Sequence, residues 1–231
     1  MSWVDLKADD GTSLRAFVAR PEGRATRGLL LFQEAFGVNA HIRDLAGRFA
    51  AERFLVIAPE LFHRTAPGFE CAYTDFPLAT PHLQAITEKG LDADVRAAFG
   101  WLEREGVGGN AAAVGYCLGG RVAFVANSAV PLKAAASYYG GRIPPLLGRT
   151  PQLSGPMLFC WGGQDHHIPE ADRQAVVSSL RDANKVFVNV LFSDADHGFF
   201  CDARASYHPA AAAQAWNVTT TFLDRYCPKP G

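Results

Sequence analysis

The stretch Gly115-Tyr116-Cys117-Leu118-Gly119-Gly120 joins two segments of different character and decides the fold. Residues 111–116 before it form a short apolar run, which is typical of strands buried on both faces. Residues 118–126 after it have the pattern of a helix. Glycines on both sides of a cysteine permit a tight turn with a strained central residue. The stretch therefore predicts a strand, a sharp turn that exposes Cys117, and a helix whose positive end faces the thiol.

The same alternation of strand and helix extends over most of the chain. Residues 3–8 and 13–19 predict a hairpin joined at Asp9-Asp10-Gly11. Buried strands are predicted at 28–33 and 54–58, and further strands at 111–116, 132–138, 156–161 and 185–192. Helices are predicted from Asn39 and over 91–102, 118–126, 169–180 and 209–226, whereas 60–84 predict a long loop. This order indicates an α/β fold with a mostly parallel sheet and helices on both faces.

Composition limits the classes of protein to which the chain can belong. Its 231 residues, 48% hydrophobic and 19% charged, predict one globular domain over 1–231. A net charge of −1 argues against a nucleic-acid partner, and no apolar run approaches the ~20 residues of a membrane span. The N-terminus lacks the apolar core of a signal peptide, and the five cysteines show no CxxC spacing. We therefore expect reduced thiols and a cytoplasmic protein.

Two further loops carry an acid and a histidine, and each follows a predicted strand. Asp165 follows the strand 156–161, and His197 follows the strand 185–192. Each residue also has a simpler interpretation: Cys117 as a buried structural cysteine, Asp165 as a helix cap near residue 169, and His197 as a solvated loop residue. Nevertheless, the order nucleophile, acid, histidine is that of α/β-hydrolases, and the carboxyl ends of parallel strands meet at one edge. The three together predict a catalytic triad.

The chain resembles the dienelactone hydrolases from about Leu30 to the C-terminal helix. The motifs that carry the resemblance are Gln33-Glu34-Ala35-Phe36-Gly37-Val38-Asn39, GYCLGG at 115–120, Tyr138-Tyr139-Gly140, Gly162-Gly163-Gln164-Asp165 and Asp196-His197-Gly198. The cysteine in the turn is specific, since most α/β-hydrolases carry serine there. The resemblance implies an α/β-hydrolase fold and a Cys-His-Asp triad that hydrolyses dienelactone to maleylacetate, with no metal or organic cofactor.

The resemblance also implies roles for residues around the triad. A glutamate at the position of Glu34 hydrogen-bonds the resting thiol and helps to generate the thiolate when substrate binds. The oxyanion is expected to lie against the backbone N–H groups of Leu118 and Ala35. We place Phe36, Tyr139 and Arg204 in the substrate pocket. No zinc pattern is found among the histidines and cysteines, so no metal site is expected.

The chain departs from the family at two arginines that hold the substrate carboxylate. No arginine occurs between Arg64 and Arg96, where the first is expected, and Cys201 stands four residues after His197, where the second is expected. Arg204 lies near enough in sequence to substitute. Whether dienelactone is the substrate is therefore an open question. The alternatives are a carboxylesterase or thioesterase that acts on another small ester, and a non-catalytic protein that binds small molecules.

Overall fold

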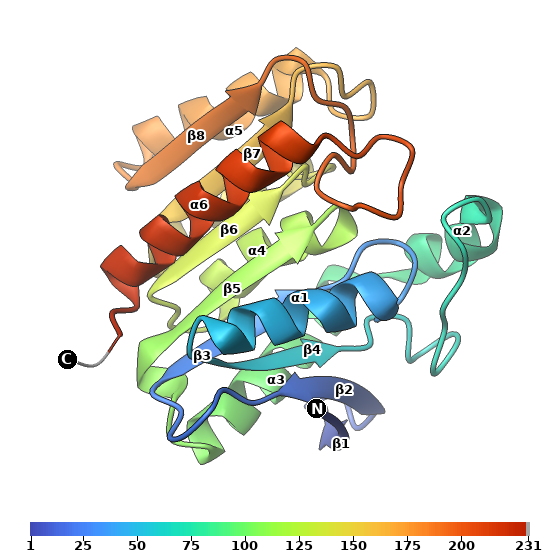
Figure 1. Ribbon diagram of the computed structural model, residues 1–231, viewed down its shortest axis with the longest axis vertical. Coiled ribbons are helices and arrows are strands. Elements are labelled where there is room, and N and C mark those ends of the chain that lie inside the picture. Colours follow the sequence, from blue (N-terminus) through green and yellow to red (C-terminus); the bar gives the residue numbers. More distant parts are fainter. Residues whose placement is uncertain (230–231) are drawn as a thin grey trace.

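Eight strands form one sheet in the order β1-β2-β4-β3-β5-β6-β7-β8 (Figure 1). This computed structural model describes residues 1–229. The strands are β1 Ser2–Lys7, β2 Ser13–Ala19, β3 Arg27–Phe32, β4 Phe54–Pro59, β5 Ala111–Tyr116, β6 Ala134–Tyr138, β7 Met157–Gly162 and β8 Phe187–Phe192. β1 and β2 form the predicted hairpin, and β2 also pairs antiparallel with β4. All other pairs are parallel, which confirms the predicted α/β fold.

Helices cover both faces of this sheet. Helix α1, Ala40–Ala51, and helix α6, Pro209–Tyr226, lie on one face in Figure 1. Helices α3 Glu88–Arg104, α4 Leu118–Ala129 and α5 Glu170–Asp182 lie behind the sheet in the same view. The sequence marks the start of α1, because the Asn39 side chain accepts the Ile42 N–H at 3.2 Å as an N-cap. Within residues 1–229, every helix is too short or too polar to cross a membrane.

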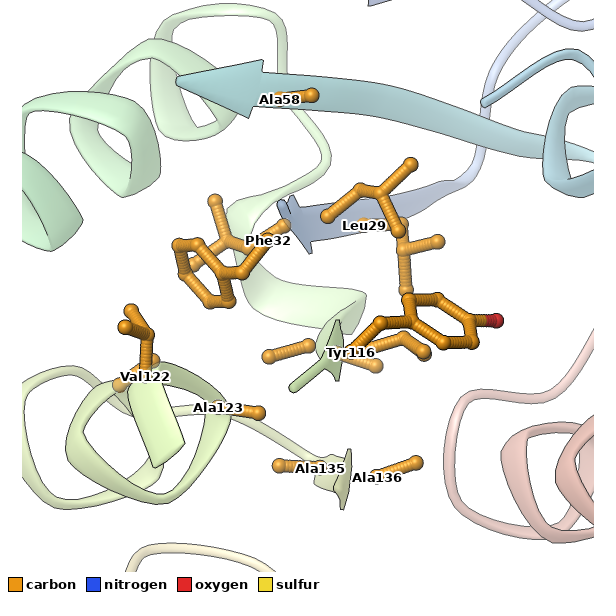
Figure 2. Close-up of a cluster of buried hydrophobic side chains, with 14 of the residues drawn as sticks. Leu29, Phe32, Ala58, Tyr116, Val122, Ala123, Ala135 and Ala136 are labelled. Carbon is orange, nitrogen blue, oxygen red and sulfur yellow. The ribbon is translucent and has the colours of Figure 1, made fainter. Parts of the chain in front are cut away.

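The central strands are buried on both faces. Every residue of β3, β4, β5, β6 and β7 is buried. Figure 2 shows Phe32 on the same side of the sheet as Val122 of α4, whereas Leu29 and Tyr116 lie on the opposite side. Burial on both faces explains why these strands appear in the sequence as continuous apolar runs without alternation.

The prediction of a loop over 60–84 is wrong for its last third. Helix α2, Phe76–Ala85, lies there, with Pro77 in its first turn and Pro81 inside it. Proline is acceptable in a first helical turn, but an internal proline removes a backbone hydrogen bond and hides the helical pattern. Ala79 of α2 packs on Phe36 in a second, smaller core beside the end of β3. Two short 3₁₀ segments, Gly108–Asn110 and Pro144–Gln152, were also not predicted.

Candidate active site

The turn between β5 and α4 holds Cys117 in a strained conformation. Its backbone has φ 53° and ψ −114°, a region that residues with a side chain rarely adopt. The neighbouring glycines leave no room for a Cβ atom. A Cβ on Gly115 would lie 1.8 Å from the Gly119 carbonyl oxygen, and one on Gly119 would lie 2.2 Å from that of Phe32. The turn therefore presents a thiol at the N-terminus of α4, and only glycine fits at these positions.

Asp165 and His197 meet in a direct hydrogen bond. The Nδ1 atom of His197 lies 2.7 Å from Oδ2 of Asp165, whose side chain is almost fully buried. The second carboxylate oxygen of Asp165 accepts the backbone N–H of His167 at 2.8 Å. Asp165 does not cap α5, because the N-cap is Pro169 and no side chain caps that helix. The carboxylate is therefore held by two donors and fixes the orientation of the imidazole.

The charge of Cys117 acts on the imidazole of His197. Burial alone would lower the pKa of His197, but the negative charge of a Cys117 thiolate opposes it. Together with hydrogen bonds to Asp165 and Cys117, that charge raises the pKa from the ordinary value of 6.5 to about 10. Burial would raise the pKa of Asp165, but the hydrogen bonds and charges of His197 and His167 together outweigh it and lower that pKa. The structure thus brings Cys117, His197 and Asp165 together, with His197 interacting with both of the other residues.

We expect the pKa of His197 to depend on Cys117. Because the folded pKa lies above the ordinary value, the pairing stabilises the fold fully below pH 6.5 and is lost as pH rises through about 10. In Cys117→Ala the pKa of His197 should fall by at least about one unit, or roughly 1.4 kcal/mol. An NMR titration of the imidazole measures this directly, and urea unfolding across the same pH window gives the stability. An unchanged titration midpoint would show that the thiolate does not act on His197.

The two backbone N–H groups predicted for the oxyanion hole have no acceptor within the part of the chain that the structure describes. Gly119 N–H donates to the Gln33 carbonyl at 2.9 Å, which ties the start of α4 to the end of β3. Leu118 is the first residue of α4, so its N–H has no acceptor within the helix. Among residues 1–229, neither Leu118 nor Ala35 donates its N–H to a backbone or side-chain acceptor. Both amides are therefore free to donate a hydrogen bond to a ligand oxygen.

Glu34 is paired with Arg204 in this structure. Its side chain is buried, and its Oε1 atom accepts from Nη1 of Arg204 at 3.2 Å. Its Oε2 atom has no hydrogen-bond partner among the described residues. The hydrogen bond from the Cys117 thiol that the resemblance implies is therefore absent from this arrangement. A buried carboxylate needs a partner, and Arg204 supplies one from a loop that follows β8.

The remaining predicted residues surround this ion pair. Tyr139 is buried with φ 36°, and its ring lies 5.1 Å from that of His197. Phe36 is buried, and the Arg204 guanidinium lies 5.7 Å from its ring centre. Sequence reasoning missed Tyr73, whose ring packs edge-on against Phe36 at 4.6 Å and whose hydroxyl accepts from Asn39 at 3.0 Å. No motif or period in residues 60–84 marks Tyr73, so no sequence signal could have identified it.

Comparison with known proteins places the chain among hydrolases. The sequence model of the "Dienelactone hydrolase family" matches residues 14–227. The "Putative carboxymethylenebutenolidase" of Synechocystis is 35% identical over 204 residues, which cover 81% of either chain. The carboxymethylenebutenolidase of Pseudomonas putida is 29% identical, over 95% of this chain and 94% of its own.

Solved structures agree with the fold. A crystal structure titled "Putative Dienelactone Hydrolase" from Klebsiella pneumoniae superimposes with a TM-score of 0.86 at 28% identity, covering 98% of this chain and 100% of that one. A dienelactone hydrolase-like promiscuous phosphotriesterase from metagenomic libraries superimposes with a TM-score of 0.84, over 97% and 98% of the two chains. At 21% identity, the second structure supports the fold alone.

Proposed function

The chain belongs to the dienelactone hydrolase family, and on that basis we propose that it hydrolyses a small carboxylic ester or lactone through a thioester on Cys117. The observation that supports this most strongly is the hydrogen bond of 2.7 Å between Asp165 and His197, together with the influence of Cys117 on the pKa of His197. The three residues follow the carboxyl ends of three strands. A nucleophile beside a base, with the base oriented by an acid, is the general arrangement for covalent catalysis.

The proposed reaction has two steps. In the first, the Cys117 thiolate attacks the substrate carbonyl carbon, and the oxyanion accepts hydrogen bonds from the Leu118 and Ala35 amides. The carbon–oxygen bond of the ester then breaks, and His197 gives its proton to the leaving oxygen when that oxygen needs one. In the second, His197 takes a proton from water, which attacks the thioester and returns the sulfur as thiolate. In a lactone the leaving oxygen stays tethered to the acyl group.

We assign Arg204 to the carboxylate of an anionic substrate. The Arg204 side chain reaches back over Gly198, where a Cβ would lie 2.3 Å from its Nη1 atom. Burial would lower the pKa of Arg204, but the negative charges around it, that of Glu34 first and that of Cys117 among the others, together outweigh burial and raise the pKa. A substrate carboxylate that bonds Arg204 competes with Glu34 for the same guanidinium. In this scheme substrate binding frees Glu34, which fits the role that the resemblance implies for it.

We expect Arg204→Ala to act mainly on substrates that carry a carboxylate. A hydrogen bond to a charged group contributes about 1.5–3 kcal/mol, so kcat/KM for an anionic lactone should fall roughly 10- to 150-fold. For a neutral aryl ester of similar size it should change little. The double variant Arg204→Ala/Glu34→Gln removes the unpaired buried charge and serves as the folding control. A carboxylate preference that survives Arg204→Ala in full would assign the carboxylate to another cation.

The missing second arginine favours one alternative, a carboxylesterase or thioesterase acting on an uncharged small ester. With a single arginine, the preference for dienelactone over neutral lactones should be weaker than in relatives with two. A panel of dienelactone, neutral lactones, aryl esters and thioesters separates these substrates by kcat/KM. If no member of the panel is turned over while one of them raises the melting temperature, the chain is a binder and not a hydrolase.

A further inference from the structure

A cluster of three donor groups lies between α1 and the loop that joins β8 to α6. The groups belong to His41, Cys201 and Asp202, and one ligand atom from each lies within 4.8 Å of the other two. His41 is the second residue of α1, whereas Cys201 and Asp202 follow the catalytic loop that carries His197. Figure 1 shows that this loop and the start of α1 lie at the same end of the sheet.

The imidazole of His41 is a buried polar group whose hydrogen bonding is incomplete. Only 6% of its side chain is exposed, yet within residues 1–229 it forms no hydrogen bond. Its Nδ1 atom lies 3.7 Å from Oδ1 of Asp202, beyond hydrogen-bond distance, and its Nε2 atom is buried without a partner. A buried polar atom without a protein partner is costly, and such atoms commonly bind an ion or an ordered water.

The geometry points to a site for a divalent cation of the zinc class, held by His41, Cys201 and Asp202. One imidazole nitrogen, one sulfur and one carboxylate oxygen are the donors that zinc prefers, whereas calcium and magnesium take oxygen donors. Three protein ligands leave a fourth position for water. The ligand atoms of a tetrahedral zinc site are about 3.5 Å apart, as bond lengths of about 2.0–2.3 Å require. The three ligand atoms already lie within 4.8 Å of one another, so small side-chain movements bring them to this spacing.

Charge and access both suit a cation at this cluster. Asp202 supplies a negative charge close to the imidazole, because its Oδ1 atom lies 3.7 Å from Nδ1 of His41. This charge offsets the positive end of α1. Asp202 also lines a surface hollow of about 260 Å³ between α1 and α6, so its carboxylate is reached from solvent. Its side chain is 75% exposed and can move to close the coordination sphere.

A cation there would tie the loop that carries His197 to α1. Since the folded state alone brings the three donors together, the bound metal stabilises the fold by mass action. This proposal does not depend on the hydrolase reaction. The test must prevent metal binding at the triad, however, because Cys117 and His197 can also bind soft metals.

The test uses Cys117→Ala, stripped with a chelator and titrated with Co²⁺ as a spectroscopic probe. We expect one equivalent to bind, with the absorption of a cobalt–thiolate bond, and zinc to raise the melting temperature. Adding Cys201→Ser should abolish the thiolate absorption and weaken binding by at least about 100-fold, since even groups that only orient a ligand are worth 10- to 100-fold. Cys71→Ser, at a half-buried thiol outside the cluster, is the matched control and should leave both unchanged.

If the Cys201→Ser variant does not fold, Asp202→Asn provides a second test of the same site. Its side chain is exposed, so the variant should fold, and loss of the carboxylate should weaken metal binding by at least about tenfold. The proposal is overturned if Cys117→Ala shows no saturable binding, or if binding persists without thiolate absorption, or if it is unchanged in both cluster variants. The first outcome would leave an ordered water as the partner of His41, and the other two would place the bound metal elsewhere in the protein.

Discussion

Replacement of Cys117 by alanine is expected to abolish hydrolysis of every ester and lactone that the wild-type protein accepts. The variant loses the atom that forms the thioester, so kcat should fall by at least about 10⁴-fold, the scale seen when a nucleophile is removed from a triad. The residual rate should reflect only the oxyanion amides and substrate binding. Steady-state kinetics on the best substrate of the panel measure the loss, and mass spectrometry of the quenched wild-type enzyme detects the thioester.

The fold of the Cys117→Ala variant should remain intact. Cys117 is half-buried in a turn, and alanine meets the same positive-φ strain that cysteine already bears. The free energy of unfolding should therefore change by about 1 kcal/mol or less. Cys71→Ser, which removes a thiol outside the triad, should retain near-full activity and is the matched control. Unchanged turnover in Cys117→Ala would refute the proposed nucleophile.

The central strands could be predicted because burial on both faces produces a simple apolar pattern in their sequence. β5 was predicted at its observed bounds, since a strand buried on both faces is an unbroken apolar run that stops at a turn. Helix α6 also matches, because Pro209 marks its first turn. Helix α2 was missed because its stability comes from packing Ala79 on Phe36, a contact between distant segments that no local pattern records.

Some contacts of the candidate site could likewise be predicted from the sequence, whereas others could not. The contact between Asp165 and His197 could be predicted, because both follow parallel strands whose carboxyl ends lie at one edge of the sheet. The pairing of Glu34 with Arg204 could not, because it depends on the path of an irregular loop across 170 residues of sequence. The substitution of Cys201 for an arginine likewise became informative only when the structure placed it beside His41.

Asp165→Asn and His197→Ala are each expected to lower kcat by about 10³- to 10⁴-fold. Without His197 no group activates water for the second step, so the thioester should form slowly and persist. Asparagine at 165 keeps the shape but can donate an N–H toward Nδ1, which favours the wrong tautomer of the imidazole. It also removes the negative charge that helps to keep the pKa of His197 raised.

Combining either change with Cys117→Ala should cost little more than Cys117→Ala alone, because members of a triad act as a unit and their effects are not additive. His167→Ala is the matched control, since its ring lies 5.1 Å from that of His197 but only its backbone N–H bonds Asp165. It should retain most of the activity. If Asp165→Asn keeps near-full kcat, the buried hydrogen bond of 2.7 Å is only structural and His197 works without an acid. If instead the losses in the double variants multiply, the three residues act independently and the triad proposal fails.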